Sequence, residues 1–349
     1  MSAFITGSAS YLPEGVVTNE AIAARLGLDP EQIFKSSGIR RRCWAPSGTT
    51  TSSLATAALR VAIEDAALKI DQIDYLLFGT MTPDRLIPGS AAAVQSALGL
   101  REVPCLDIRA ACCNALYALD LARALVLTGS ATNVAVCLAE VQTPFLDLSN
   151  KAATLSMLFG DGAAALIVSN QPSVSASADH PNLEIIDVML ATNGQYVDDL
   201  GIRCPGTEFG TASSHPATEH LTDYAPRMNG QSVILQASRR MVSAGRSLLE
   251  RNQLTSKDVR WLVPHQANAN LLAQVARGLG LGQSECEVVS VLEDLGNTSS
   301  ASMGIALDSL RRAKKIKRDD YLLLPAFAAG FTWGAALCRA FESATDEHG

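Results

Sequence analysis

The chain has 349 residues, of which 48% are hydrophobic and 18% are charged, and its formal net charge is −7 at pH 7. This composition is typical of a globular protein with a large core, and it excludes a disordered chain. The acidic balance provides no overall attraction for nucleic acid or for an anionic membrane, so we expect neither as a partner.

The N-terminal stretch MSAFITGSASYLPEG has neither the basic region nor the long apolar region of a secretory signal. An uninterrupted apolar run of about 18 residues is also missing, which predicts that no segment spans a membrane. The eight cysteines show no C-x-x-C spacing, and most lie inside apolar runs. This pattern predicts reduced thiols in a cytoplasmic protein, with neither a disulfide framework nor a metal site.

In chain order, short apolar runs alternate with longer helical patterns, which indicates an α/β fold. The residues in the predicted strands are 75–81, 133–141, 163–169, 261–264, 320–327 and 334–341. The residues in the predicted helices are 52–68, 112–129 and 233–252. The long polar stretch 204–226 has no periodicity and is predicted to be a loop that is disordered or covers a site.

A weak internal repeat indicates that the chain is duplicated. An offset of 188 places DLARAL (120–125) over DSLRRA (308–313) and NVAVCLA (133–139) over YLLLPAF (321–327), and DGAAALIV (161–168) resembles WGAALCRA (333–340). The polar segment 170–182 is rich in turn formers and forms a natural seam. We therefore predict an N-terminal half at 1–172 and a C-terminal half at 183–345.

Two adjacent cysteines, Cys112 and Cys113, begin the predicted helix CCNALYALDLARALVLTG. A helix N-terminus favours a thiolate and an oxyanion through its free N–H groups and its dipole, so one thiol is a candidate nucleophile. The alternative is that both thiols only fill space in a tight core.

Three further positions are candidates for chemistry. His265 follows a strand directly in WLVPHQANANLL, whereas the other histidines lie in polar loops or the tail. Asn297 follows Gly296 in LEDLGNTSSASMGIAL, where it is either a turn residue or a site residue, and the serine run after it is suited to capping a helix. Gly330 lies between two predicted strands, where it makes either a plain turn or a close backbone approach to a ligand.

Taken in order, DIRAACCNALYAL, FGDGAAA, WLVPHQANANLL, LGNTSSAS and AFAAGFTWGAAL resemble β-ketoacyl-acyl-carrier-protein synthase III of the thiolase superfamily. The stretches GSASYLPEGVVTN and SSGIRRR resemble it too, so the likeness extends from about residue 3 to 342. It implies a thiolase-like, duplicated five-layer α-β-α-β-α fold and a homodimer.

The resemblance also assigns roles to residues. Cys112 matches the nucleophile, with Cys113 at a position that has no chemistry in the family. His265 and Asn297 match the pair that completes a Cys-His-Asn site, and Gly330 matches the backbone donor that joins the Cys112 N–H in an oxyanion hole.

Further residues are expected at the substrate pocket. Ile87 matches a position that reaches from one subunit into the acyl pocket of the other, and Phe331 follows the oxyanion-hole glycine. Asn114 stands where the family has a smaller run, so we expect it to narrow or polarise the pocket wall. Arg85 is expected to pair with a carboxylate on a diacid substrate or to lie on the surface.

Three positions depart from members of the family that use coenzyme A. Those members place a Trp and Arg residues at the mouth to hold the adenine, where this chain has Gln32, Ser36 and about Ala153. A carrier-protein-bound or unusual acyl donor is therefore favoured over coenzyme A, and the departures favour a specialised pathway.

The leading hypothesis is a decarboxylating Claisen condensation. An acyl thioester is transferred to Cys112 and then joined to a malonyl-type substrate on an acyl carrier protein, giving a β-ketoacyl product in fatty acid or polyketide-like biosynthesis, without a cofactor. The alternative is acyl transfer from Cys112 to an alcohol or amine, which Asn297 disfavours because an amide cannot accept the proton. A non-catalytic partner and a papain-like protease are weaker alternatives.

Overall fold

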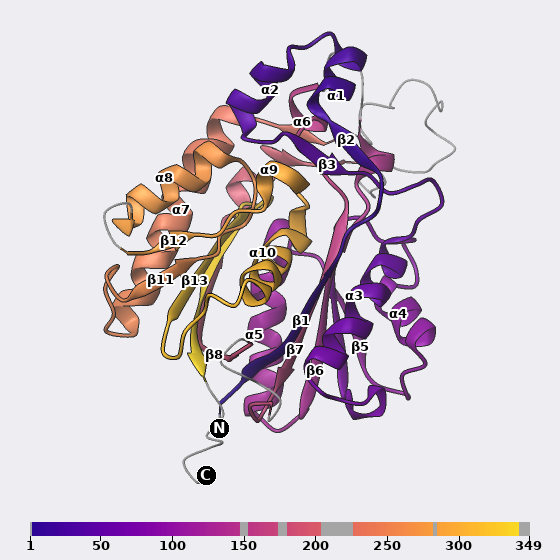
Figure 1. Cartoon of the computed structure of the whole chain (residues 1–349), viewed down its shortest axis with the longest axis vertical. Coiled ribbons are helices and arrows are strands. Elements are labelled where there is room, and N and C mark those ends of the chain that lie inside the picture. Colours follow the sequence, from indigo (N-terminus) through magenta and orange to yellow (C-terminus); the bar gives the residue numbers. More distant parts are fainter. Residues whose placement is uncertain (1, 147–152, 174–179, 204–225, 282–284, 342–349) are drawn as a thin grey trace.

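A computed structural model of the chain describes residues 2–146, 153–173, 180–203, 226–281 and 285–341 (Figure 1). Its strands are β1 Phe4–Tyr11, β2 Val16–Thr18, β3 Arg41–Cys43, β4 Tyr75–Gly79, β5 Cys105–Ile108, β6 Asn133–Glu140, β7 Gly162–Ser169, β8 Asn182–Thr192, β9 Leu200–Gly201, β10 Arg227–Met228, β11 Val259–Leu262, β12 Glu287–Val288, β13 Tyr321–Ala328 and β14 Thr332–Phe341. Its α-helices are α1 Asn19–Leu26, α2 Pro30–Ser37, α3 Thr51–Asp65, α4 Ser90–Leu98, α5 Asn114–Leu127, α6 Ala153–Ser156, α7 Gly230–Arg251, α8 Ala269–Leu279, α9 Leu292–Leu295 and α10 Ser302–Arg312. Two 3-10 turns matter below: η2 Ala111–Cys113 and η9 Ser299–Ala301.

Ten of the strands hydrogen-bond in the order β12-β11-β13-β14-β8-β1-β7-β6-β4-β5. The order outward from β1 is β1-β7-β6-β4-β5, and the order outward from β8 is β8-β14-β13-β11-β12. Each series is therefore the first, fifth, fourth, second and third strand of its half. The two halves have the same topology, and they meet where β1 pairs antiparallel with β8.

The layers follow from which face of each strand is apolar. Helices α3 and α4 pack on one face of the N-terminal strands, and α7 and α8 pack on one face of the C-terminal strands. Helices α5 and α10 fill the space between the two sets of strands and share one core with both (Figure 1). Residues in these strands alternate between the cores, because successive side chains point to opposite faces.

The structure confirms the predicted five-layer α/β fold. Each of the six predicted strands overlaps an observed strand, and the matched repeats occupy equivalent places: β6 and β13, β7 and β14, and helices α5 and α10. The predicted helix at 112–129 begins with the tighter turn η2 before α5. The predicted loop at 204–226 lies outside the described residues except for Pro226.

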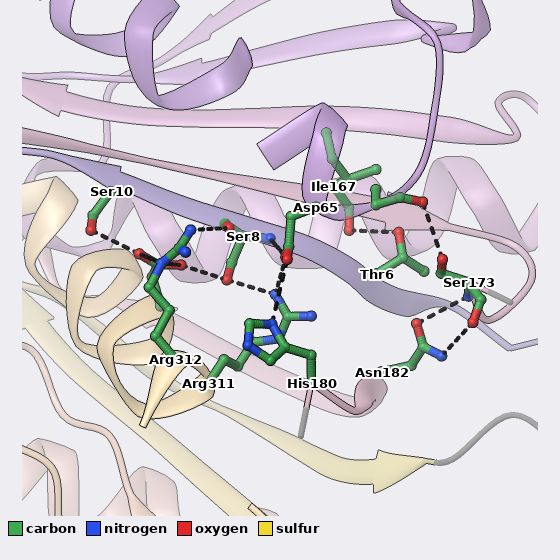
Figure 2. Close-up of polar contacts among 12 residues, drawn as sticks. Thr6, Ser8, Ser10, Asp65, Ile167, Ser173, His180, Asn182, Arg311 and Arg312 are labelled. Carbon is green, nitrogen blue, oxygen red and sulfur yellow. Dashed lines mark hydrogen bonds and ion pairs between the residues drawn. The ribbon is translucent and has the colours of Figure 1, made fainter. Parts of the chain in front are cut away.

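A polar network ties the C-terminal end of α10 to β1 and α3 (Figure 2). Arg311, which is 2% exposed, binds the carboxylate of Asp65 at 2.7 Å and the hydroxyl of Ser8 at 2.6 Å. Asp308 accepts hydrogen bonds from the hydroxyls of Ser8 (2.8 Å) and Ser10 (2.7 Å) and forms an ion pair with Arg312. This network joins an element of the second half to two elements of the first.

None of the helices in the described ranges has the length and apolar character needed to cross a membrane.

Candidate active site

A cavity of about 290 Å³ opens between the two halves, and its wall is mainly apolar. The first half contributes Cys112, Met81 and Gln142, and the second half contributes His265 and Asn297 among others. The described residues that line it include no Asp, Glu, Lys or Arg. The three predicted catalytic residues therefore share one cavity with few charges.

The nucleophile candidate lies on a forced turn. Strand β5 leads into Ala111, whose φ of 52° places a non-glycine residue in the left-handed region immediately before Cys112. Such a conformation costs about 1–3 kcal/mol and persists only where the surrounding structure imposes it. Ser299, whose φ is 47°, lies opposite, with its Oγ 3.3 Å from Sγ of Cys112. Two strained residues thus hold the thiol and a hydroxyl together.

The two adjacent thiols have different surroundings. Cys113 is fully buried, and its Sγ donates to the carbonyl of Thr332 at 3.5 Å, so it has a packing role. Cys112 lines the cavity. Burial raises the pKa of the Cys112 thiol to about 11, the hydrogen bond from Ser299 opposes this, and the charge of Glu140 reinforces it. The N-terminus of α5 also favours the thiolate.

His265 lies where the chain continues along β13 past the end of β11. The N–H of Val263 donates to Leu323 O at 2.9 Å, and the N–H of His265 donates to Pro325 O at 3.0 Å, so the backbone here is fixed. The ring Nδ1 lies 2.7 Å from Oγ of Ser302. Burial lowers the pKa of His265 to about 4, so the ring is neutral at pH 7.

Asn297 is held by backbone contacts between the halves. Its N–H donates to Leu158 O at 2.7 Å, and its carbonyl accepts from Gly160 N at 3.1 Å and from Gln142 Nε2 at 3.0 Å. The preceding Gly296 has a φ of 66°, and a Cβ there would lie 2.9 Å from Leu158 O. This close approach requires glycine.

The side-chain amide of Asn297 is also oriented. Its Oδ1 accepts from the N–H of Ser299 at 2.9 Å, which leaves the Nδ2 group as the free donor. The Asn297 amide therefore presents a hydrogen-bond donor to a cavity that also contains the His265 ring and the Cys112 thiol.

A buried carboxylate behind the site was not among the predicted residues. Glu140, at the end of β6, accepts from Met81 N (3.0 Å), Thr82 Oγ1 (2.7 Å) and Ser300 Oγ (2.6 Å). Burial raises its pKa, whereas the hydroxyl donors oppose that change. The signal in the sequence is a charged residue that ends the otherwise apolar strand NVAVCLAE.

The serine run after Asn297 contacts several residues of the site, which the sequence did not predict. Ser299 contacts Cys112, Ser300 contacts Glu140 and Ser302 contacts His265. No side-chain cap at α10 accompanies these contacts. The run therefore contacts the site residues, whereas the sequence predicted helix capping.

Gly330 and Phe331 do not line the cavity, which is lined instead by Phe327 and Ala329 from the same strand end and turn. Phe331 is 1% exposed, because its ring stacks on Tyr196 at 4.9 Å and packs against Phe327 at 4.7 Å. The aromatic ring at this wall of the cavity is therefore that of Phe327.

Asn114 also lies away from the cavity surface. It is fully buried, and its Oδ1 accepts from the N–H of Ala110 at 2.6 Å. The short polar side chain turns back on the chain and fixes the turn that carries Cys112. Its role is to shape this turn, and it does not narrow the pocket wall.

Arg85 and Ile87 lie on the exposed loop between β4 and α4 and do not line the cavity of the single chain. The side chain of Ile87 is 87% exposed. Its predicted reach into the pocket of a partner subunit remains a prediction.

The donor set of the site does not indicate a metal. Within the described ranges, no cluster of three or more His, Cys, Asp or Glu side chains is arranged to hold one.

Comparisons with known proteins show the family of the chain. Residues 106–194 match the family model of 3-oxoacyl-[acyl-carrier-protein (ACP)] synthase III, and residues 249–340 match the model of its C-terminal part. Together these matches cover both the Cys112 segment and the His265 and Asn297 segments.

Relatives and solved structures extend the match to nearly the full length. The chain is 36% identical to β-ketoacyl-[acyl-carrier-protein] synthase III of Methylococcus capsulatus, covering 96% of this chain and 98% of that protein, and 35% identical to that of Chlamydia caviae, covering 97% of each. The Thermus thermophilus synthase III structure superposes with a TM-score of 0.84 at 31% identity over 97% of this chain and 99% of that one. The priming β-ketosynthase of the R1128 polyketide pathway gives a TM-score of 0.86 at 29% identity over 99% and 97%. The chain therefore belongs to the β-ketoacyl-[acyl-carrier-protein] synthase III family of condensing acyltransferases.

Proposed function

We propose that the enzyme joins an acyl group carried on Cys112 to a malonyl-type thioester on an acyl carrier protein, with loss of carbon dioxide. The observation that carries this proposal is that one apolar cavity brings the thiol of the first half together with the His265 ring and the oriented Asn297 amide of the second half. The product is a β-ketoacyl thioester of fatty acid or polyketide-like biosynthesis.

In the first half-reaction, Sγ of Cys112 attacks the carbonyl carbon of the acyl thioester. The new C–S bond forms, and the donor's thiol leaves with the proton from Cys112. We propose that the tetrahedral oxyanion is stabilised by two backbone N–H groups, that of Cys112 in η2 and one from the turn after β13. We keep Gly330 as a candidate for the second donor, together with its neighbour Ala329, which lines the cavity.

In the second half-reaction, the bond between the malonyl carboxylate and the methylene carbon breaks. Carbon dioxide leaves, and the electron pair moves onto the thioester oxygen, which His265 and Asn297 stabilise as hydrogen-bond donors. The absence of cations among the described lining residues favours this step, because nothing there holds the carboxylate charge. The enolate carbon then attacks the acyl group and expels the Cys112 thiolate.

The alternative is acyl transfer to an alcohol or amine, which requires a base for the acceptor's proton. Asn297 cannot act as a base at any ordinary pH, and its Oδ1 already accepts from the N–H of Ser299, so its side chain offers the cavity a donor, which supports condensation. Incubation with an acyl thioester and malonyl carrier protein, followed by mass spectrometry of the carrier, tests this. A β-ketoacyl product with release of carbon dioxide supports condensation, and acyl transfer to an alcohol without malonyl substrate contradicts it.

We further propose that the acyl donor is carrier-bound. Gln32 and Ser36 are exposed on α2, with Ser36 at the cavity mouth, and neither supplies an aromatic or guanidinium face. One aromatic–guanidinium pair beside this helix is already engaged, since Arg40 lies 3.8 Å from the ring centroid of Phe34 and binds Glu293 at 2.7 Å. Cys112 should be acylated faster by an acyl group loaded on the carrier protein than by the same acyl group on coenzyme A. The reverse order would contradict this choice.

We propose that the enzyme works as a homodimer through the loop that carries Ile87. Leu86 and Ile87 are 67% and 87% exposed, and Leu106 on the edge strand β5 is 41% exposed, which leaves apolar surface for a partner. Arg85 on the same loop then lies near the partner's pocket. Sedimentation of wild type and Ile87→Asp tests this, since the variant should shift towards monomer.

We also propose that the enzyme is located in the cytoplasm, which the free thiols of the described residues support.

A further inference from the structure

Ser302 is the first residue of α10, and its hydroxyl is fully buried between two groups of the second half. Its Oγ lies 2.7 Å from Nδ1 of His265 and accepts from the N–H of Gln266 at 3.2 Å. The described residues offer its hydroxyl hydrogen no other acceptor, and the side chain has no access to solvent. The direction of the bond to His265 therefore follows from counting donors and acceptors.

Two arrangements of protons are possible for a neutral ring. If Nδ1 carries the proton, Ser302 receives two donors, and its own buried hydrogen is left without an acceptor. If Ser302 donates to Nδ1, every donor and acceptor at this point is satisfied. Leaving a buried polar hydrogen unpaired is costly, so the second arrangement is favoured.

We propose that Ser302 is a positioning residue that donates to Nδ1 of His265 and thereby keeps the ring proton on Nε2. Nε2 has no hydrogen-bond partner among the described residues, and His265 lines the cavity, so this nitrogen is the one available to a substrate. The neutral state of the ring agrees with the lowered pKa of His265.

This arrangement has a consequence for the two half-reactions, and it rests on the proposed condensation. A ring with its proton on Nε2 offers the cavity a donor and no lone pair. It therefore stabilises the enolate oxygen of the second half-reaction and does not serve as the base for the Cys112 thiol. Loss of Ser302 should slow decarboxylation and condensation while acylation of Cys112 continues.

The experiment uses full-length Ser302→Ala and Ser302→Thr, with Ser309→Ala as the matched control. Ser309 lies on the same helix, seven residues later, and is exposed. We expect Ser302→Ala to lower kcat for condensation about tenfold to a hundredfold, with KM nearly unchanged; this is less than the loss of an oxyanion donor itself, because the imidazole remains. Acylation of Cys112, followed by intact mass, should match wild type. Ser302→Thr should recover most of the rate because it keeps the hydroxyl.

A second measurement reads the proton directly and does not depend on turnover. In wild-type enzyme labelled with ¹⁵N-histidine, long-range ¹H–¹⁵N spectra should show His265 protonated at Nε2, with His265→Ala giving the assignment. A ring protonated at Nδ1, or a Ser302→Ala variant that condenses at the wild-type rate, would overturn the proposal. If wild type makes no condensation product, the proposed function fails, and the spectrum still decides the role of Ser302.

Discussion

The two ends of helix α10 each bring buried polar groups of both halves together, but they differ in whether an unpaired polar atom lines the cavity: Nε of Arg311, at the C-terminal end, is buried without a partner and lies away from it. At the C-terminal end, the carboxylates of Asp65 and Asp308 each accept two or more donors. At the N-terminal end, His265 and Asn297 each use one polar atom for orientation and leave one donor facing the cavity. Paired polar groups contribute to stability and specificity of the fold, whereas oriented and unpaired groups beside a cavity indicate chemistry.

The largest effect is expected at the nucleophile. Cys112→Ala should lower condensation by at least about 10³-fold, because the covalent intermediate is lost while the oxyanion donors remain. Intact mass after exposure to an acyl thioester should show no acyl adduct. Cys113→Ala is the control and should still acquire the adduct, since its thiol contacts only the protein interior. Equal condensation rates of Cys112→Ala and wild type would show that Cys112 is not the nucleophile and that the N-terminal end of α10 does not adjoin the site of the reaction.

The next effect is expected at the opposite end of α10. Arg311→Met leaves Asp65 without its buried cation and should lower the free energy of unfolding by about 3 kcal/mol, with the kcat of the folded enzyme unchanged. Urea unfolding and initial rates measure the two quantities. Arg312→Met is the control: this side chain is 47% exposed, so a smaller loss of about 1 kcal/mol is expected. A loss of kcat in Arg311→Met would show that the two ends are coupled.

The same network predicts a pH dependence. Burial alone would raise the pKa of Asp65, but Arg311 and the N–H of Ser8 outweigh it and lower that pKa. A lowered pKa contributes stability that is present above the unfolded value, about 4, and is lost as the pH falls through the folded value. The acid side of the unfolding free-energy curve should therefore be flatter in Arg311→Met than in wild type. Parallel curves would contradict the assignment.

Asn297→Asp should sharpen the comparison at the catalytic end. The new side chain keeps the acceptor for Ser299 N–H and loses the donor, so condensation should fall about 10²-fold while acylation of Cys112 continues. Stopped-flow release of carbon dioxide and intact mass separate the two steps. A fall in acylation of the same size would mean that Asn297 acts before decarboxylation.

The smallest effect is expected from Glu140, whose charge raises the pKa of Cys112. Glu140→Gln should increase the iodoacetamide alkylation rate of Cys112 a few-fold at neutral pH, because more thiolate is present. The amide should be accommodated, since Ser300 Oγ also lies 3.3 Å from Gly79 O and its hydroxyl can turn to donate there. The exposed Glu293→Gln serves as the control, and an unchanged rate in Glu140→Gln would contradict the electrostatic link.

The sequence motifs predicted Cys112, His265 and Asn297 only when taken together, because each residue alone was equally compatible with packing or a turn, and their order and spacing resemble a known family. They did not predict where Asn114 points, since a buried helix offers several directions and only the backbone turn at Ala110 selects one. Strands β1 and β8 were also missed. The small polar residues in FITGSASY and the mixed pattern of NLEIIDVMLAT hide strands whose partners come from distant parts of the chain.

The division of the site between the halves has a consequence for biosynthesis of the enzyme itself. The thiol emerges from the ribosome with the first half, long before the donors of the second half exist. In the proposed mechanism, a partly synthesised or half-folded chain therefore has the nucleophile but lacks the two donors that stabilise the enolate. We therefore expect condensation of malonyl thioesters only once both halves have packed on α5 and α10.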